Sequence, residues 1–93
     1  MNLTTKITVG IVDDHWTIHY GLIDFINSLP RFMVTFTAVN GEDLIQQYNS
    51  GLPFPQIIIM DMRMPGMDGI ATTEWLFKKH PEIKVIGLRT CPK

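Results

Sequence analysis

The chain has 93 residues, of which 45% are apolar, and eight basic against nine acidic residues give a net charge of −1. This length suits one small domain and excludes two. The near-neutral balance excludes the strong attraction to nucleic acid or membranes that a basic protein shows. The single cysteine, Cys91, excludes an internal disulfide, and no apolar run reaches the length of a membrane span. We therefore expect a cytoplasmic protein without direct contact to nucleic acid or membrane.

The first part of the chain predicts a strand, a helix and a second strand. Residues 6–12 are a short β-branched run that is apolar on both faces, as in a buried strand of a parallel sheet. Residues 15–29 carry apolar side chains at helical spacing, and Pro30 ends that helix. The apolar side of the helix consists of Ile18, Leu22, Phe25, Ile26 and Leu29. Residues 32–39 alternate and favour a strand.

The rest of the chain continues this alternation. Asn40 is a favourable N-cap for a second helix, which Gly51 can end. Residues 56–60 predict a fully buried third strand, residues 69–80 a third helix and residues 83–88 a fourth strand. Strands and helices that alternate through short loops predict a doubly wound α/β domain, in which helices cover both faces of a parallel sheet.

Three aspartates lie at the carboxyl ends of two predicted strands. Asp13 and Asp14 follow the first strand, and Asp61 follows the third. If the strand order is 2-1-3-4, these two strands are neighbours at the switch point, where doubly wound sheets place their sites. Three carboxylates in one pocket need a counter-ion, and a hard divalent cation such as Mg²⁺ supplies one. Taken singly, the aspartates could also be loop, cap or turn residues, but their conjunction favours a metal site.

Two stretches of the chain resemble the receiver domains of two-component response regulators. Residues 12–22, VDDHWTIHYGL, resemble the opening of receivers that carry a C-terminal helix-turn-helix output domain. Residues 60–70, MDMRMPGMDGI, resemble the phosphoacceptor stretch of the same group. The resemblance covers almost the whole chain. It implies a flavodoxin-like doubly wound parallel sheet of order 2-1-3-4 with three helices, in a phosphoprotein that takes part in transcription control rather than in enzymatic turnover.

The resemblance also implies individual roles for the polar residues. Asp61 would be the phosphoacceptor, whose carboxylate attacks a phosphoryl group donated by a histidine kinase. Asp14 and Asp61 would bind Mg²⁺ directly, and Asp13 would hold it mainly through water. The backbone carbonyl of Arg63 would be a further metal ligand. Asp68 would cap the third helix rather than bind the metal.

The chain departs from the receiver pattern at the end of the fourth strand. Receivers place a Ser or Thr there, to contact the phosphoryl group, but Arg89 stands at that position in this chain. Thr90 comes one residue later, and a shift of one residue turns a side chain to the other face of a strand. We therefore expect the switch hydroxyl to be absent unless the strand adjusts so that Thr90 serves. Lys93 comes too early to correspond to the receiver lysine, which follows a fifth strand.

The complete receiver fold has a fifth strand and two more helices that residues 1–93 do not supply. We therefore expect a receiver-like domain that is truncated relative to the five-strand fold. The fourth strand would be left at the edge of the sheet, and Ile7, Val9, Ile11 or their neighbours would lose their cover on one side. Because an apolar patch rarely stays exposed on a monomer, we expect the chain to self-associate.

Two alternative functions remain open from the sequence. A Mg²⁺-dependent phosphohydrolase on a similar fold would want a second carboxylate two residues after Asp61, where this chain has Arg63. A degenerate receiver-like module, which binds or dimerises without switching, is supported by Arg89 at the switch position. A phosphodonor assay with Mg²⁺ separates the three, because only a receiver gains one labile phosphoryl group.

Overall fold

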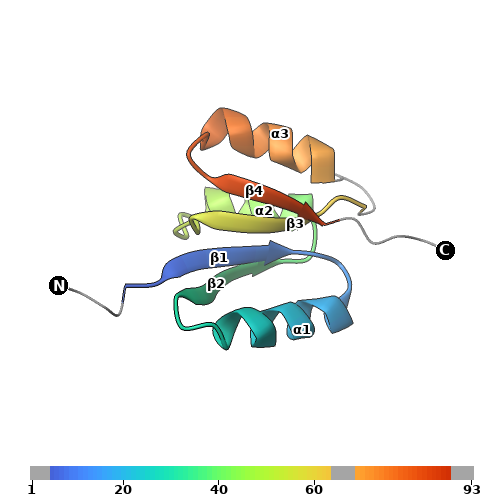
Figure 1. Cartoon of the computed structure of the whole chain (residues 1–93). Coiled ribbons are helices and arrows are strands. Elements are labelled where there is room, and N and C mark those ends of the chain that lie inside the picture. Colours follow the sequence, from blue (N-terminus) through green and yellow to red (C-terminus); the bar gives the residue numbers. More distant parts are fainter. Residues whose placement is uncertain (1–4, 64–68, 89–93) are drawn as a thin grey trace.

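Four parallel strands form a single sheet in the order β2-β1-β3-β4 (Figure 1). The structure is a computed structural model that describes residues 5–63 and 69–88. The strands are β1 (Ile7–Val12), β2 (Phe32–Ala38), β3 (Ile57–Asp61) and β4 (Lys84–Leu88). The predicted doubly wound sheet of order 2-1-3-4 is therefore confirmed, and β4 lies at one edge, as expected.

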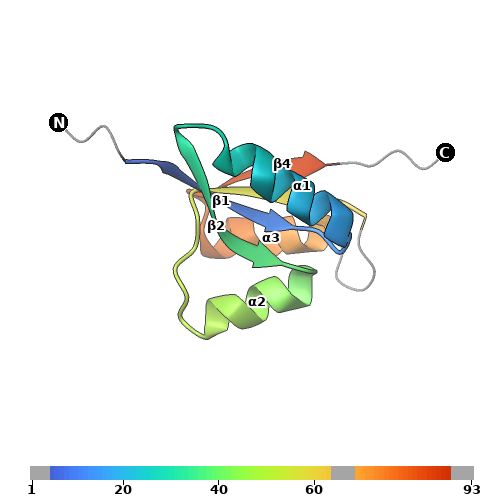
Figure 2. The ribbon, with the colours of Figure 1, turned by 90° about the horizontal axis from the view of Figure 1, so that it is seen from below.

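Helices cover both faces of this sheet. Helix α1 (Trp16–Asn27) lies on one face, and helices α2 (Gly41–Asn49) and α3 (Gly69–Lys79) lie on the other (Figures 1 and 2). Helix α1 ends two residues before the predicted end, because the backbone N–H of Ser28 already caps it by donating to carbonyls of the last turn. The expectation that Phe25 faces the core is wrong. Its side chain is 62% exposed, whereas its neighbour Ile26 is buried.

Helix α2 begins and ends as its sequence predicts. The side chain of Asn40 accepts a hydrogen bond of 2.7 Å from the backbone N–H of Asp43, and the Asp43 carboxylate accepts one of 3.0 Å from the N–H of Val39. This reciprocal arrangement satisfies N–H groups that a helix start leaves without partners. Beyond the last turn, Gly51 adopts a φ of 87°, which glycine tolerates and other residues rarely adopt.

The larger core lies between the sheet and helices α2 and α3. Its buried members come from three strands and both helices and are Val12, Phe36, Ala38, Leu44, Ile58, Met60 and Leu76. An aromatic cluster extends this core toward the amino-terminal ends of the strands. In it, the ring of Tyr48 lies 5.1 Å from those of Phe54 and Trp75 and 5.3 Å from that of His80. Aromatic pairs at such distances stabilise a fold beyond the area that they bury.

The smaller core lies under α1 and corrects one expectation. Val9 and Ile11 were expected to lose cover, but they are 3% and 0% exposed because α1 packs over them. The incomplete cover lies further across the same face, where Ile86 of β4 is 46% exposed. An apolar groove remains beside α1, lined by Val9, Ile26, Leu29, Phe32, Ile57, Ile59 and Ile86. Self-association through such a surface stays a prediction.

None of the helices in the described part of the chain combines the length and the apolar character that crossing a membrane requires.

Candidate metal centre

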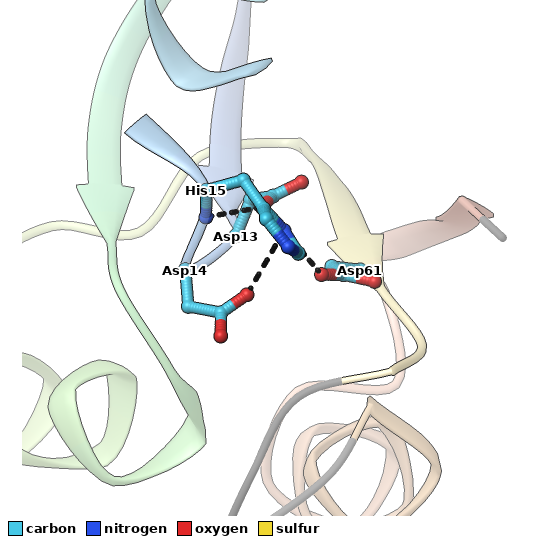
Figure 3. Close-up of side chains that lie close together, drawn as sticks. All are labelled: Asp13, Asp14, His15 and Asp61. Atoms are coloured by element: carbon cyan, nitrogen blue, oxygen red, sulfur yellow. Dashed lines mark hydrogen bonds and ion pairs between the residues drawn. The ribbon is translucent and has the colours of Figure 1, made fainter. Parts of the chain in front are cut away.

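The three aspartates meet at the carboxyl ends of β1 and β3, which are neighbours in the sheet (Figure 3). Asp13 directly follows β1, and its backbone N–H donates to the carbonyl of Ala38 in β2 at 3.1 Å. Asp61 is the last residue of β3 and pairs with Leu88 of β4. The sheet therefore fixes the backbone that carries both carboxylates, and these side chains lie at the carboxyl ends of the strands.

Both of these carboxylates are buried but only partly satisfied. Asp13 and Asp61 are each 1% exposed. Oδ1 of Asp13 accepts a hydrogen bond of 2.7 Å from the N–H of His15, and Oδ1 of Asp61 accepts one of 2.9 Å from the N–H of Arg63. The Oδ2 atoms of Asp13 and Asp61 have no hydrogen-bond partner among the described residues. Because burying an unpaired carboxylate oxygen is costly, the pocket suits a bound cation.

The side chain of His15 lies over all three carboxylates (Figure 3). Its Nδ1 atom is 3.1 Å from Oδ1 of Asp13, 3.1 Å from Oδ1 of Asp14 and 3.7 Å from Oδ2 of Asp61. The hydrogen bond with Asp13 and the charge of Asp14 raise the pKa of His15 above its usual value. Sequence reasoning did not assign His15 to the site, although its place directly after the Asp13–Asp14 pair was a signal.

Burial is the main reason that the pKa of Asp61 is raised. The negative charges of Asp13 and Asp14 raise it further, whereas the hydrogen bond from Arg63 and the nearby His15 lower it. The folded protein therefore holds a proton on this carboxyl group more readily than the unfolded chain does. A cation in the pocket would lower the pKa of Asp61 again. Its positive charge would offset both the cost of burying the carboxylate and the repulsion from Asp13 and Asp14.

Glycine at position 69 allows α3 to begin directly against the tip of β3. A Cβ atom at Gly69 would lie 2.6 Å from the carbonyl oxygen of Asp61 and 2.6 Å from Cα of Met62. Both neighbours are backbone atoms, which cannot move aside as the end of a side chain can. The close packing of α3 against this backbone thus helps to define the position of Asp61.

Four donor groups come together at this site. One donor atom from each of Asp13, Asp14, His15 and Asp61 lies within 4.8 Å of every other. Arg63 lies two residues after Asp61, and the hydrogen bond from its N–H to Oδ1 of Asp61 places its backbone at the site. The predicted roles of Asp13, Asp14, Asp61 and the Arg63 carbonyl as ligands stay predictions. The remaining residues considered from the sequence, Asp68, Arg89, Thr90 and Lys93, lie outside the described residues.

Comparison with known proteins gives a consistent set of matches. A family model described as the response regulator receiver domain matches residues 9–90. Response regulator GacA from Pseudomonas protegens is 31% identical over 85 residues, which are 91% of this chain. Transcriptional regulatory protein DegU from Brevibacillus brevis is 33% identical over 86 residues, which are 89% of this chain.

A solved structure shows a similar fold. A chain of the CheX–CheY complex from Borrelia burgdorferi is 28% identical and has a TM-score of 0.82, covering 96% of this chain and 66% of that chain. The sequence relatives are longer. This chain spans 39% of the length of GacA and 34% of the length of DegU.

Proposed function

The chain belongs to the family of response regulator receiver domains, and from that premise we propose that it is a phosphoacceptor domain with Asp61 as the modified residue. The observation that carries the proposal is the state of the Asp61 carboxylate. It is held by β3, it is buried, and its Oδ2 atom has no hydrogen-bond partner among the described residues. An oxygen fixed in this way beside two further carboxylates suits phosphoryl transfer assisted by a cation.

The proposed reaction makes Asp61 the nucleophile. A bond forms between a carboxylate oxygen of Asp61 and the phosphorus atom, and the bond between phosphorus and a histidine nitrogen of the kinase breaks. The N–H of Arg63 holds Oδ1 of Asp61 at 2.9 Å and so fixes the orientation of the carboxylate. Oriented donors of this kind need no rearrangement when the reaction occurs.

The metal in the proposal is Mg²⁺, held by Asp13, Asp14, Asp61 and the carbonyl of Arg63. When bound, such an ion neutralises the negative charge of the carboxylates and the phosphoryl oxygens. Asp14 and Asp61 would bind the ion directly and Asp13 mainly through water, and the Oδ2 atoms of Asp13 and Asp61 would then no longer be buried without a partner. The similar chain from B. burgdorferi comes from a complex that contains BeF3 and Mg²⁺, which supports this assignment by likeness.

The proposed partner is a histidine kinase, because receiver domains take phosphoryl groups from such kinases. We place the chain in the cytoplasm and in transcription control, since the relatives include a transcriptional regulatory protein. The segment would not contact nucleic acid itself, in keeping with its net charge of −1. Its role would be to carry a phosphoryl group rather than to turn over a substrate.

A small phosphodonor with Mg²⁺ tests the proposal. Intact-mass measurement should show that the chain gains one phosphoryl group, and Asp61→Asn should abolish the gain. The matched control is Asp24→Asn, which removes an exposed carboxylate of α1 away from the pocket and should leave the modification unchanged. Modification at another residue, or steady release of phosphate from the donor, would contradict the proposal. No modification at all would favour a module that binds without switching.

A further inference from the structure

The imidazole of His15 lies beside the proposed metal site, a placement that sequence reasoning did not foresee. His15 occupies the N-cap position of α1, and its backbone N–H is bound to Asp13. This bond holds the residue beside the pocket, and its Nδ1 atom is directed toward the carboxylates of Asp13, Asp14 and Asp61 (Figure 3).

Nδ1 of His15 lies within hydrogen-bond distance of Oδ1 of Asp13, and His15 provides one of four donor atoms that all lie within 4.8 Å of one another. In an octahedral site with metal–ligand bonds of about 2.1 Å, neighbouring ligand atoms are about 3 Å apart, and a metal would be about 2 Å from each. Nδ1 of His15 lies 3.1, 3.1 and 3.7 Å from carboxylate oxygens of Asp13, Asp14 and Asp61. The two distances of 3.1 Å are close to this edge length, and the distance of 3.7 Å would have to shorten for these atoms to bind one ion.

A second observation points independently to a cation at the same place. The Oδ2 atoms of Asp13 and Asp61 are buried and have no hydrogen-bond partner in the described ranges, residues 5–63 and 69–88. Oδ2 of Asp61 is also the atom that lies 3.7 Å from Nδ1 of His15. The unsatisfied oxygen and the imidazole nitrogen therefore border the same space.

We propose that Nδ1 of His15 is a direct metal ligand and that this site consequently binds Mn²⁺ in preference to Mg²⁺. Carboxylate and carbonyl ligands suit Mg²⁺, Ca²⁺ and Mn²⁺, whereas imidazole suits first-row transition metals. Mn²⁺ accepts the oxygen ligands and gains from the nitrogen. The proposal deepens the proposed function, because it names a further ligand and the preferred ion of the same site.

Pulsed electron paramagnetic resonance of Mn²⁺ bound to the whole chain tests the ligand directly. The wild type should show modulation from a coupled ¹⁴N nucleus, and His15→Ala should lose it. His80→Ala is the matched control, because His80 lies near the other end of the sheet, 2.8 Å from Glu82, and should leave the signal unchanged. A wild-type spectrum without nitrogen modulation, or a signal that disappears only in His80→Ala, would overturn the proposal.

Metal titrations of the same proteins test the preference. His15→Ala should weaken Mn²⁺ binding about tenfold, in line with losses measured when metal sites are altered, and should change Mg²⁺ binding much less. Equal weakening for both ions would overturn the proposal, and so would tighter binding of both, which would mean that His15 competes with the metal. If His15→Ala does not fold, His15→Asn, which also removes the imidazole, takes its place.

The two proposals can fail separately. A nitrogen signal from Mn²⁺ without phosphorylation of Asp61 would reject the proposed function and keep His15 as a ligand. Phosphorylation of Asp61 without a nitrogen signal would keep the proposed function and reject His15 as a ligand.

Discussion

Met60 and Asp61 are neighbours at the end of β3, and both side chains are buried, but they lie in regions of opposite character. Met60 belongs to the apolar core beneath α2 and α3, where every neighbour adds favourable contact. Asp61 belongs to the acidic pocket, where burial and like charges raise its pKa. Burial therefore stabilises the fold on one side of this peptide bond and lowers its stability on the other. A site built to bind a cation lowers the stability of the cation-free protein, and binding of the cation stabilises the fold.

The largest effect is expected from truncating the apolar core. Leu76 of α3 is 0% exposed, and Leu76→Ala should lower the free energy of unfolding by about 2–5 kcal/mol, through lost burial and the cavity left behind. Chemical denaturation measures this loss. Phe77→Ala is the control, because Phe77 is 69% exposed on the same helix and should cost about 0.5 kcal/mol or less. Similar losses for both would mean that α3 does not pack as described.

A smaller loss in the free energy of unfolding is expected at Gly69, where the apolar core meets the acidic pocket. Gly69→Ala would bring a methyl group within 2.6 Å of the backbone of Asp61 and Met62, which should cost about 1–3 kcal/mol. It should also weaken Mg²⁺ binding, because the tip of β3 would have to move. Thermal unfolding with and without Mg²⁺ measures both effects.

The control for this change is Gly21→Ala. A Cβ atom at Gly21 of α1 would meet nothing within 4 Å, so alanine should stabilise that helix by about 0.5–1 kcal/mol. If both alanine variants are equally stable, the contact at Gly69 does not define the site.

Removing a charge from the acidic pocket should raise the stability of the metal-free protein rather than lower it. Asp61→Asn removes a charge that burial and Asp13 and Asp14 disfavour, while its amide oxygen can still accept from the N–H of Arg63. Without metal, the melting temperature should rise by a few degrees, since about 1 kcal/mol corresponds to about 4–8 °C in a domain of this size. A lower melting temperature would show that the carboxylate contributes net stability.

The smallest effect concerns pH. The pKa of His15 is raised in the folded protein, so the stability that its charged form contributes is fully present below pH 6.5 and is lost as pH rises through the folded pKa. The advantage of the metal-free wild type over His15→Asn in melting temperature should therefore be larger at pH 6 than at pH 8.5. A difference that does not change with pH would contradict the raised pKa.

The sheet could be predicted from the sequence because its strands are simple in composition. Residues 56–60, with four consecutive apolar side chains after Gln56, predict a buried strand, and the structure confirms a strand here, β3 at Ile57–Asp61. The resemblance of residues 12–22 and 60–70 to receivers is confirmed by the family match. The meeting of Asp13, Asp14 and Asp61 also followed from the strand order, although their roles stay predictions.

Other features depend on three-dimensional packing that local patterns do not specify. The position of His15 over the carboxylates depends on the turn between β1 and α1 and on its bond to Asp13. The cover of Val9 and Ile11 depends on where α1 packs on the sheet. The less protected residue is therefore Ile86, not those named from the sequence. The need for glycine at position 69 appears only when the backbone of Asp61 is in place.

The strand order also determines when β1 can pair with each of its neighbours as the chain is synthesised. β1 lies inside the sheet and pairs with β3 (Figure 1). The backbone and side chain of Thr8 form hydrogen bonds with those of Gln56, 48 residues later. At about 5–20 residues per second, a ribosome needs about 2–10 s to add that segment. During this interval β1 can pair with β2, but its other edge has no partner from its own chain. Of the four described strands, β1 is made first but is among the last to have both neighbours in place, and its open edge is where a nascent neighbour could pair wrongly.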